Sequence, residues 1–273
     1  MSNKSTHSTV SNIMNELEKG LSEVRNIIAV LSGKGGVGKS IIASALAVGL
    51  SMKGYRVALF DADFHGPSIP WILGVENSYL GVTLEGKLIP IELNNLAIIS
   101  IELLLNDKNA PIIWRGPLKA RTILDLMTKT LWGKRDYLIV DLPPGTGDEA
   151  LTIAQYLRIK PLSAILVLTP GSMVSHIVTK AKEFVKVLGV PLLGAVINMS
   201  YFECPVCGTK HYIFGNVDLK DVDILAEIPI DPALAQAVEK SQFVEFMKSD
   251  NKSAQILRML SDIVEARTRD EAH

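Results

Sequence analysis

The sequence predicts an α/β protein built on a mostly parallel sheet with helices on both faces. Apolar runs of strand length alternate with stretches of helical character from Asn26 onward, and parallel strands need such crossovers. A glycine-rich loop joins the first apolar strand, Ile27 to Leu31, to a helix over Ile41 to Met52. A net charge of -1 and 48% hydrophobic residues over 273 positions exclude a disordered chain and disfavour bulk polyanion binding.

The first 25 residues form a polar extension, and 26–273 are expected to form one domain. Ser, Thr and Asn dominate the first ten residues, which predicts disorder there. Ile13, Leu17, Leu21 and Val24 then recur at the spacing of a short amphipathic helix. The start has no apolar signal region, and no apolar run approaches the roughly 20 residues that cross a bilayer. We therefore expect a cytoplasmic protein without membrane contact.

The remaining elements follow in order along the chain, with about seven strands in all. Strands are predicted at Ile27 to Leu31, Arg56 to Phe60, Leu96 to Ile101, Tyr137 to Val140, Ser163 to Leu168, Leu192 to Ile197 and Ile224 to Ile228. Further helices are predicted at Leu118 to Leu131, Glu149 to Leu157, Val174 to Leu188 and Ser253 to Arg269. Gly74 to Pro90 is expected to form a small hairpin, and 200–221 an insertion between two late strands.

The glycine-rich loop fits the P-loop pattern, in which a glycine, four residues and Gly-Lys-Ser stand between a strand and a helix. Its residues are Gly33, Lys34, Gly35, Gly36, Val37, Gly38, Lys39 and Ser40. Glycines let the backbone N–H groups turn inward around phosphate oxygens, and the helix N-terminus adds its positive dipole. Lys39 is expected to reach the β- and γ-phosphates, and the Ser40 hydroxyl to ligate Mg²⁺. The pattern predicts a bound nucleotide.

Dinucleotide binding is the main rival interpretation of this loop. Gly33, Gly35 and Gly38 also satisfy the pattern of a dinucleotide-binding turn, and Asp61 follows the next strand. A nicotinamide cofactor, however, gives Lys39 and its neighbouring serine no role. Asp141 also ends the strand from Tyr137, where a nucleoside triphosphatase places a carboxylate near Mg²⁺. We therefore favour a nucleoside triphosphatase.

Lys34 directly after the first glycine marks the deviant form of the P-loop, and here the sequence resembles the MinD/ParA-like dimerising ATPases. The resemblance implies that Lys34 crosses to the nucleotide of a partner subunit, where its charge would act like an arginine finger. It also implies that Asp63 positions the attacking water and Asp61 supports the ion, although the two roles could be exchanged. Asp141 to Asp148 resembles a switch segment that senses the γ-phosphate.

The chain has two cysteines, Cys204 and Cys207, spaced so that both thiolates can bind one metal ion or cluster. Tetrahedral zinc and a four-iron cluster need four donors, and His211 is the only further donor near them in the sequence. A second copy of the chain is therefore expected to complete the site. Zinc on these cysteines, with His211 or across a dimer, dithiol redox catalysis and an inert pair are the alternatives.

Taken together, the motifs resemble those of the Mrp/ApbC-type iron-sulfur carrier ATPases over Asn26 to Gln236. Besides the P-loop, they are Asp61-Ala62-Asp63, Gly66-Pro67-Ser68, Asp141 to Asp148, Asn198 to Phe202, Cys204 to Gly208 and Ile213 to Gly215. The resemblance implies a homodimer that binds and hydrolyses ATP and holds a 4Fe-4S cluster on Cys204 and Cys207 of both subunits. The cluster would be delivered to apo iron-sulfur proteins.

The same resemblance implies that Asn198 touches the adenine. One position departs from the pattern, because Ile41 stands where a threonine commonly follows the P-loop serine. The missing hydroxyl is expected to weaken contact with the α-phosphate and to slow turnover.

A positioning or regulatory ATPase of the MinD or ParA kind, with structural zinc at the cysteine pair, is the second functional class. Such ATPases bind membrane or DNA. The closing helix, however, mixes arginines with acidic residues and presents no cationic membrane face. The net charge of -1 gives no nucleic-acid footprint either. We expect neither nucleic acid nor membrane as a partner. A nickel or zinc insertion chaperone is a third class that the same architecture could support.

Overall fold

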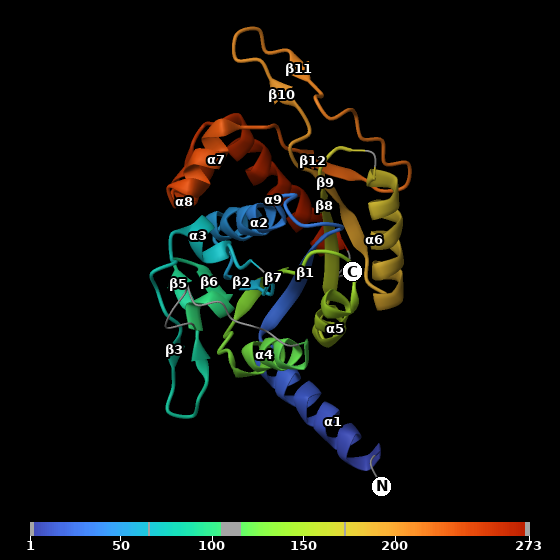
Figure 1. The fold of residues 1–273 in the computed structure, drawn as a ribbon. Helices are drawn as coiled ribbons and strands as arrows, with labels where there is room; N and C mark the ends of the chain where they lie inside the picture. The colour runs from blue at the N-terminus through green and yellow to red at the C-terminus, as the bar shows by residue number, and fades with distance from the viewer. Residues whose placement is uncertain (1–2, 65, 105–115, 172, 271–273) are drawn as a thin grey trace.

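The computed structural model describes residues 3–64, 66–104, 116–171 and 173–270. An eight-stranded sheet forms its centre, in the order β12-β9-β8-β1-β7-β2-β6-β5 (Figure 1). Every neighbouring pair in this sheet is parallel except β5 and β6. The α/β fold with a mostly parallel sheet is thereby confirmed.

All of the predicted strands are present, and among the described residues one strand of the main sheet was missed. The main sheet contains β1 (Val24–Ser32), β2 (Val57–Asp61), β5 (Ile91–Leu93), β6 (Leu96–Ser100), β7 (Arg135–Asp141), β8 (Leu162–Leu168), β9 (Leu192–Ile197) and β12 (Ile224–Glu227). The missed strand, β5, is an antiparallel edge of three residues with none fully buried, so it lacks a buried apolar run. Two small hairpins lie outside the sheet, β3 (Gly81–Val82) with β4 (Leu88–Ile89), and β10 (Phe202–Glu203) with β11 (Lys210–His211).

The helices form two groups that cover opposite faces of the sheet (Figure 1). One group contains α2 (Lys39–Met52), α3 (Ile69–Leu73), α7 (Pro232–Glu239), α8 (Phe243–Lys248) and α9 (Lys252–Asp270). The other contains α1 (Asn3–Gly20), α4 (Gly116–Lys129), α5 (Asp148–Leu157) and α6 (Val174–Leu188), and a 3₁₀ turn, η1 (Ile101–Leu104), follows β6. Within the described ranges, no helix has the length and apolar character needed to cross a membrane.

The N-terminal extension differs from the expectation. Helix α1 begins at Asn3, within the ten residues for which the sequence predicted disorder, and is longer than the short helix expected there. Leu17 and Leu21 are fully buried, and α1 packs against α4. Val24, which fits the helical spacing, instead opens β1 and pairs with Arg135 of β7. The amphipathic pattern thus serves to attach the extension to the body of the protein.

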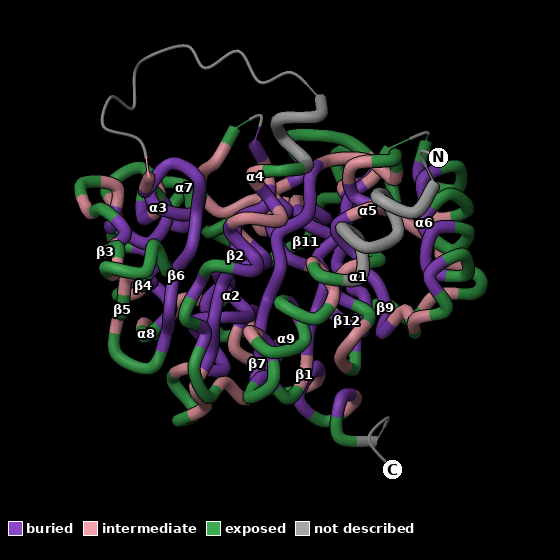
Figure 2. The backbone as a smooth tube through the Cα atoms, turned by 90° about the horizontal axis from the view of Figure 1, so that it is seen from below, coloured by how far each residue is buried: buried purple, intermediate pink, exposed green. Residues whose placement is uncertain are grey.

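The core lies on both faces of the sheet, and Figure 2 shows buried backbone gathered in the strands with exposed positions around them. Strand β8 is buried at every residue, and β1 is buried throughout its second half. Because β1, β7 and β2 are parallel neighbours, their carboxyl ends meet at one edge. The P-loop follows β1, Asp61 ends β2 and Asp141 ends β7, so the fold brings three predicted motifs together there.

An ion-pair cluster at the start of β7 yields a stability prediction. The Asp136 carboxylate accepts hydrogen bonds from the Arg56 backbone N at 3.0 Å, Nε at 3.2 Å and Nη2 at 3.0 Å, and Arg25 Nη1 lies 3.2 Å away. These bonds from Arg56 hold the pKa of Asp136 below its usual value. The stabilisation is therefore present above the unfolded carboxyl pKa, near 4, and disappears as the pH falls through the folded pKa.

We expect Asp136→Asn to lower the free energy of unfolding at pH 7 by on the order of 1 kcal/mol, because one bonded partner is partly exposed. Urea unfolding at several pH values between 7 and 3 measures the effect, and the difference from the wild type should shrink with pH. Asp125→Asn, at the more exposed i,i+4 pairs of α4 with Arg121 and Lys129, serves as the control with little effect. A pH-independent loss in Asp136→Asn would contradict the role of its charge.

Candidate functional site

The P-loop forms one wall of a cavity of about 290 Å³ at the carboxyl edge of the sheet. The loop connects Ser32, the last residue of β1, to Lys39, the first of the 14-residue helix α2. Gly36 and Gly38 have φ angles of 75° and 84°, a left-handed conformation that glycine adopts without strain. The first residues of α2 line the cavity, and a helix N-terminus after a glycine-rich loop is the arrangement that binds phosphate.

Lys39 and Ser40 converge on the carboxylate of Asp141. The buried Lys39 Nζ lies 2.6 Å from Asp141 Oδ1, and Ser40 Oγ donates a hydrogen bond of 2.6 Å to Asp141 Oδ2. Lys39 Nζ also lies 3.8 Å from Asp63 Oδ2. The two residues predicted to ligate Mg²⁺ from β7 and the P-loop, Asp141 and Ser40, are therefore neighbours in the fold.

Asp61 and Asp63 occupy different environments after β2. Asp61 is fully buried and accepts hydrogen bonds from the backbone N of Asp63 and from Ser100 Oγ, both at 3.2 Å. Asp63 retains some exposure, lines the cavity and faces Lys39. Asp63 is therefore within reach of a molecule in the cavity, whereas Asp61 is enclosed by protein.

The buried carboxylates of Asp61 and Asp141 have too little positive charge nearby to offset the effect of burial on their pKa values. Burial raises the pKa of Asp61 well above its usual range, and the neighbouring Asp141 charge raises it further against the pull of Lys39. Burial also raises the pKa of Asp141, although Lys39 lowers it. A divalent cation would stabilise both in ionised form, so the residues fit Mg²⁺. Mg²⁺ in such sites takes one or two carboxylates plus phosphate oxygens, in keeping with the lack of any three-ligand metal cluster among the described residues.

The other predicted nucleotide contacts differ in their relation to this cavity. Lys34, which is exposed, Gly35 and Ile41 line the cavity, whereas Gly33 and Asn198 are not among its lining residues. Gly33 packs so closely on α6 that a Cβ there would lie 2.4 Å from the Ile177 side chain. Asn198 is buried beside the loop, and its role at the adenine stays a prediction.

Sequence reasoning missed Ser100, which donates a hydrogen bond to Asp61 behind the cavity wall. It also missed Ile72 of α3 and Val238 of α7, which line the cavity. Ser100 could have been found, because it lies near the end of the predicted strand Leu96 to Ile101, beside the strand that ends at Asp61. The two apolar residues lie on short helices that carry no motif.

The cysteine pair lies on the β10–β11 hairpin, which projects from the body at the top of Figure 1. The turn is closed by a bond from the Gly208 N–H to the Cys204 carbonyl and one from the Cys204 N–H to the Thr209 carbonyl. Cys207 is exposed, and Cys204 is half-buried. The Thr209 hydroxyl, 3.2 Å from Cys207 Sγ, lowers the pKa of that thiol and favours the thiolate that binds metals.

His211 does not join the cysteines in a metal site. It pairs with Phe202 across the hairpin, and no group of three His, Cys, Asp or Glu among the described residues could hold a metal ion. The alternative of a zinc site on Cys204, Cys207 and His211 is therefore wrong for one chain. Two thiols on one hairpin provide half of a four-ligand set.

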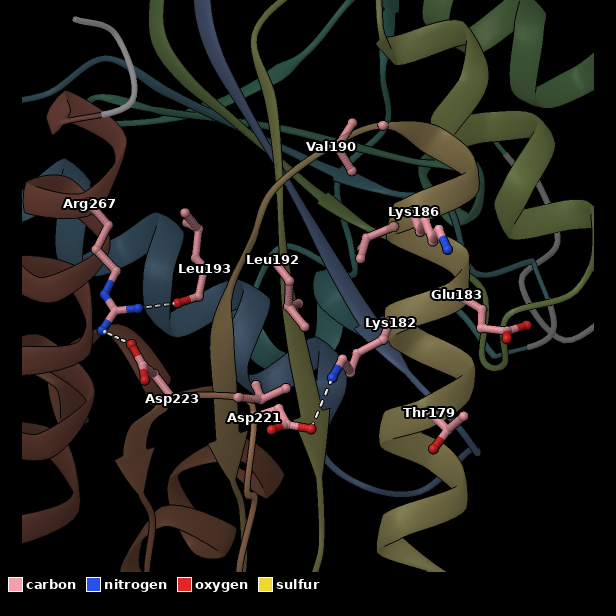
Figure 3. Close-up of a pocket in the computed structure, with 13 residues that line it drawn as sticks. Thr179, Lys182, Glu183, Lys186, Val190, Leu192, Leu193, Asp221, Asp223 and Arg267 are labelled. Carbon is pink, nitrogen blue, oxygen red and sulfur yellow. Dashed lines mark hydrogen bonds and ion pairs between the residues drawn. The ribbon is translucent and has the colours of Figure 1, made fainter.

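A second cavity, of about 830 Å³, lies between α6 and the segment that leads from the hairpin into β12 (Figure 3). Lys182 Nζ of α6 lies 3.2 Å from Asp221 Oδ2, and Arg267 Nη2 of α9 lies 2.9 Å from Asp223 Oδ2. Arg267 also donates to the Leu193 carbonyl. This cavity shares no lining residue with the P-loop cavity, and its ion pairs attach the returning segment to two helices.

Lys39→Ala is expected to raise the dissociation constant for ADP about 100-fold or more. The variant loses two charge-assisted bonds to phosphate, each about 1.5 kcal/mol or more, and leaves Asp141 facing the anion without its lysine. Isothermal titration calorimetry measures the constant. Lys180→Ala, at an exposed lysine of α6, is the control with unchanged affinity. Wild-type affinity in Lys39→Ala would contradict this assignment of the site.

Comparison with known sequences identifies close relatives. The profile of the ParA family described as NUBPL iron-transfer P-loop NTPase matches residues 23–265. The iron-sulfur cluster carrier protein of Aquifex aeolicus is 40% identical over 254 residues, which are 89% of this chain and 69% of that protein. The cytosolic Fe-S cluster assembly factor Nubp2 homolog of Drosophila ananassae is 42% identical over 250 residues, 88% of this chain and 95% of that protein.

Solved structures support the same assignment. The nucleotide-binding protein of Archaeoglobus fulgidus in complex with ADP has a TM-score of 0.75 at 35% identity, covering 85% of this chain and 93% of that one. The cell division ATPase MinD of Pyrococcus furiosus has a TM-score of 0.64 at 23% identity, covering 89% and 99%, and shows the same fold. The MinD-like P-loop architecture is confirmed, and the chain belongs to the NUBPL iron-transfer P-loop NTPase family.

Proposed function

We propose that the protein is an ATP-hydrolysing carrier that binds a 4Fe-4S cluster between two copies of the chain and transfers it to apo iron-sulfur proteins. The observation that carries the proposal is the pair of thiols on a projecting hairpin of a P-loop NTPase, with half of a ligand set in each chain. The named activities of the relatives, an iron-sulfur cluster carrier and a cytosolic Fe-S assembly factor, support the same cargo and a cytoplasmic location.

In the nucleotide site, Lys39 would leave Asp141 and bind the β- and γ-phosphates, since a phosphate group competes for its charge. Ser40 and Asp141 would hold Mg²⁺, and Asp61 would support the ion from behind Asp141. When bound, Mg²⁺ offsets the negative charge of the phosphate oxygens. Asp63, which lines the cavity, would accept a hydrogen bond from the attacking water and orient it.

Two subunits would share the catalytic work. Lys34 is exposed and lines the cavity, so its charge would be available to the nucleotide of a partner. Its charge would then act on the transferred phosphoryl group only in the dimer, as an arginine finger does. Hydrolysis and dimer formation would thus be linked.

The same dimer would complete the cluster site. Four thiolates hold a four-iron cluster, so Cys204 and Cys207 of two chains make one set. Val206, between the two cysteines, and Ile213 and Phe214, which follow β11, are exposed apolar residues. Two hairpins that meet would cover these side chains and exclude water from the cluster.

Anaerobic reconstitution of the full chain with iron and sulfide tests the proposal. We expect about two irons and two sulfides per chain in a complex of dimer mass, with the visible absorption of a four-iron cluster. A chain that binds zinc tightly but no iron would refute the carrier function. Transfer of the cluster to an apo iron-sulfur protein, with and without ATP, is the second measurement.

A further inference from the structure

Asn198 directly follows β9 and connects this strand to the P-loop. Its side chain is buried, and its Nδ2 donates a 2.9 Å hydrogen bond to the carbonyl of Val37 within the loop. A Cβ on Gly38 would lie 2.2 Å from the same nitrogen, so the side chain and the loop are in close contact. A shift of the loop on nucleotide binding must therefore act on Asn198.

Asn198 stands only six residues before Cys204, and the residues between them are firmly held. Met199 has a φ of 54°, a left-handed conformation that costs energy for a side chain of this size. Ser200 donates from its backbone N–H to the Ile228 carbonyl and from Oγ to Glu227 Oε1 at 2.8 Å. The connection is a short, bonded stretch rather than a loose linker.

Tyr201 joins this stretch to the hairpin. It is nearly fully buried, its ring lies 5.7 Å from that of Tyr212, and Lys210 Nζ lies 4.3 Å above its centroid. The next two residues form β10, and Glu203 of this strand pairs with Lys252 at the start of α9. The base of the hairpin therefore packs on Tyr201, which directly follows residues 198–200.

The other end of the insertion is attached elsewhere. The segment that returns from the hairpin to β12 is held by Lys182 of α6 through Asp221 and by Arg267 of α9 through Asp223 (Figure 3). These pairs border the second cavity, which shares no residue with the P-loop cavity. Of the two attachments, that through Asn198 reaches the nucleotide site by a direct hydrogen bond to the P-loop, whereas α6 touches the loop by apolar packing of Ile177 at Gly33.

We propose that Asn198 is a positioning residue that couples the nucleotide state of the P-loop to the position of the β10–β11 hairpin and so to the accessibility of Cys204 and Cys207. The inference deepens the proposed function and rests on it, since these thiols are the cargo site. Coupling of this kind is reciprocal, so occupation of the thiols changes nucleotide affinity by the same factor. Typical couplings lie between about 5-fold and 150-fold.

The rate of alkylation of each thiol in the full-length apo protein measures this coupling directly. Iodoacetamide is applied with no nucleotide, with saturating ADP and with a non-hydrolysable ATP analogue, and mass spectrometry follows the two cysteines separately. We expect the rate at one or both thiols to differ about 5-fold or more between nucleotide states. Bound nucleotide is quantified in every sample by equilibrium dialysis.

Two variants interrupt the route at different points. Asn198→Asp keeps the shape of the side chain but removes the donor to Val37, and it should abolish the nucleotide-dependent difference at saturating nucleotide. Tyr201→Ala removes the ring that packs the hairpin on its base, at a residue that does not line the P-loop cavity, and should also abolish the difference. Asp221→Asn, which loosens the other end of the insertion, is the control and should retain it.

Wild-type alkylation rates that do not change at saturating nucleotide would overturn the proposal. A full difference in nucleotide-bound Asn198→Asp would do the same. If Asn198→Asp binds no nucleotide, the test depends on Tyr201→Ala, whose substitution leaves the residues of the nucleotide site unchanged. A nucleotide-dependent difference in alkylation rate that persists in Tyr201→Ala would refute the route. Failure of iron reconstitution with an intact nucleotide effect on the thiols would refute the proposed cargo and leave the coupling standing.

Discussion

Lys34→Ala is expected to lower the rate of ATP hydrolysis about 10³-fold while changing the affinity for ADP little. Lys34 is exposed, unlike Lys39, which is buried against Asp141. An arginine-finger charge is worth roughly 10³ to 10⁵ in rate, which corresponds to about 4 to 7 kcal/mol of transition-state stabilisation. Phosphate release under saturating ATP measures the rate, and ADP titration measures the affinity.

Mixing this variant with Lys39→Ala tests whether Lys34 acts across the dimer. The Lys34→Ala subunit binds nucleotide but lacks the finger, and the Lys39→Ala subunit supplies a finger but binds no nucleotide. If Lys34 acts on the partner, a 1:1 mixture restores about a quarter of wild-type activity, because half of the dimers are mixed and each has one working site. If Lys34 acts on its own nucleotide, the mixture stays inactive.

Lys34→Arg is the matched control for the charge. It keeps a cation of similar reach and should retain more activity than the alanine variant, although the geometry of the guanidinium differs. Equal ATP hydrolysis in wild type and Lys34→Ala would refute a catalytic role for this lysine. A loss of ADP binding in Lys34→Ala as large as in Lys39→Ala would show that Lys34 binds the nucleotide of its own subunit.

Much of the fold was predictable because central parallel strands are buried on both faces. Strands such as β8 are continuous apolar runs, and such runs are visible in a sequence. Strand β5 was not predictable, since three partly exposed residues at an antiparallel edge carry no such run. Helices α3 and α8 are equally short, with five and six residues, and their position depends on packing against α2.

The nucleotide site was predictable where a motif is contiguous or ends a strand. The P-loop is one stretch of chain, and Asp61 and Asp141 end neighbouring strands, so their meeting follows from sheet topology. The contact of Asn198 with Val37 joins residues 161 positions apart, and no local pattern indicates it. The complete burial of Asp61, which raises its pKa, likewise depends on the packing of the whole edge.

Cys207→Ser is expected to abolish retention of the reconstituted cluster. Each chain has two thiols, so in the proposed four-ligand site the substitution would remove two of the four ligands from every dimer. A serine hydroxyl does not replace the thiolate, whose formation at Cys207 the Thr209 hydroxyl favours. Iron and sulfide per chain after gel filtration measure retention, and Cys204→Ser should behave alike.

Because the hairpin projects from the body of the protein, loss of a cluster ligand can be distinguished from loss of the fold. Cys207 is exposed on a projecting turn, so Cys207→Ser should keep the wild-type melting temperature and ADP affinity. His211→Ala alters the same hairpin at a residue that joins no three-ligand group in the described chain, and it should keep the cluster. A full cluster in Cys207→Ser would refute its role as a ligand. Loss of the cluster in His211→Ala would instead show that the dimer recruits the histidine, because within one chain it stands apart from both thiols.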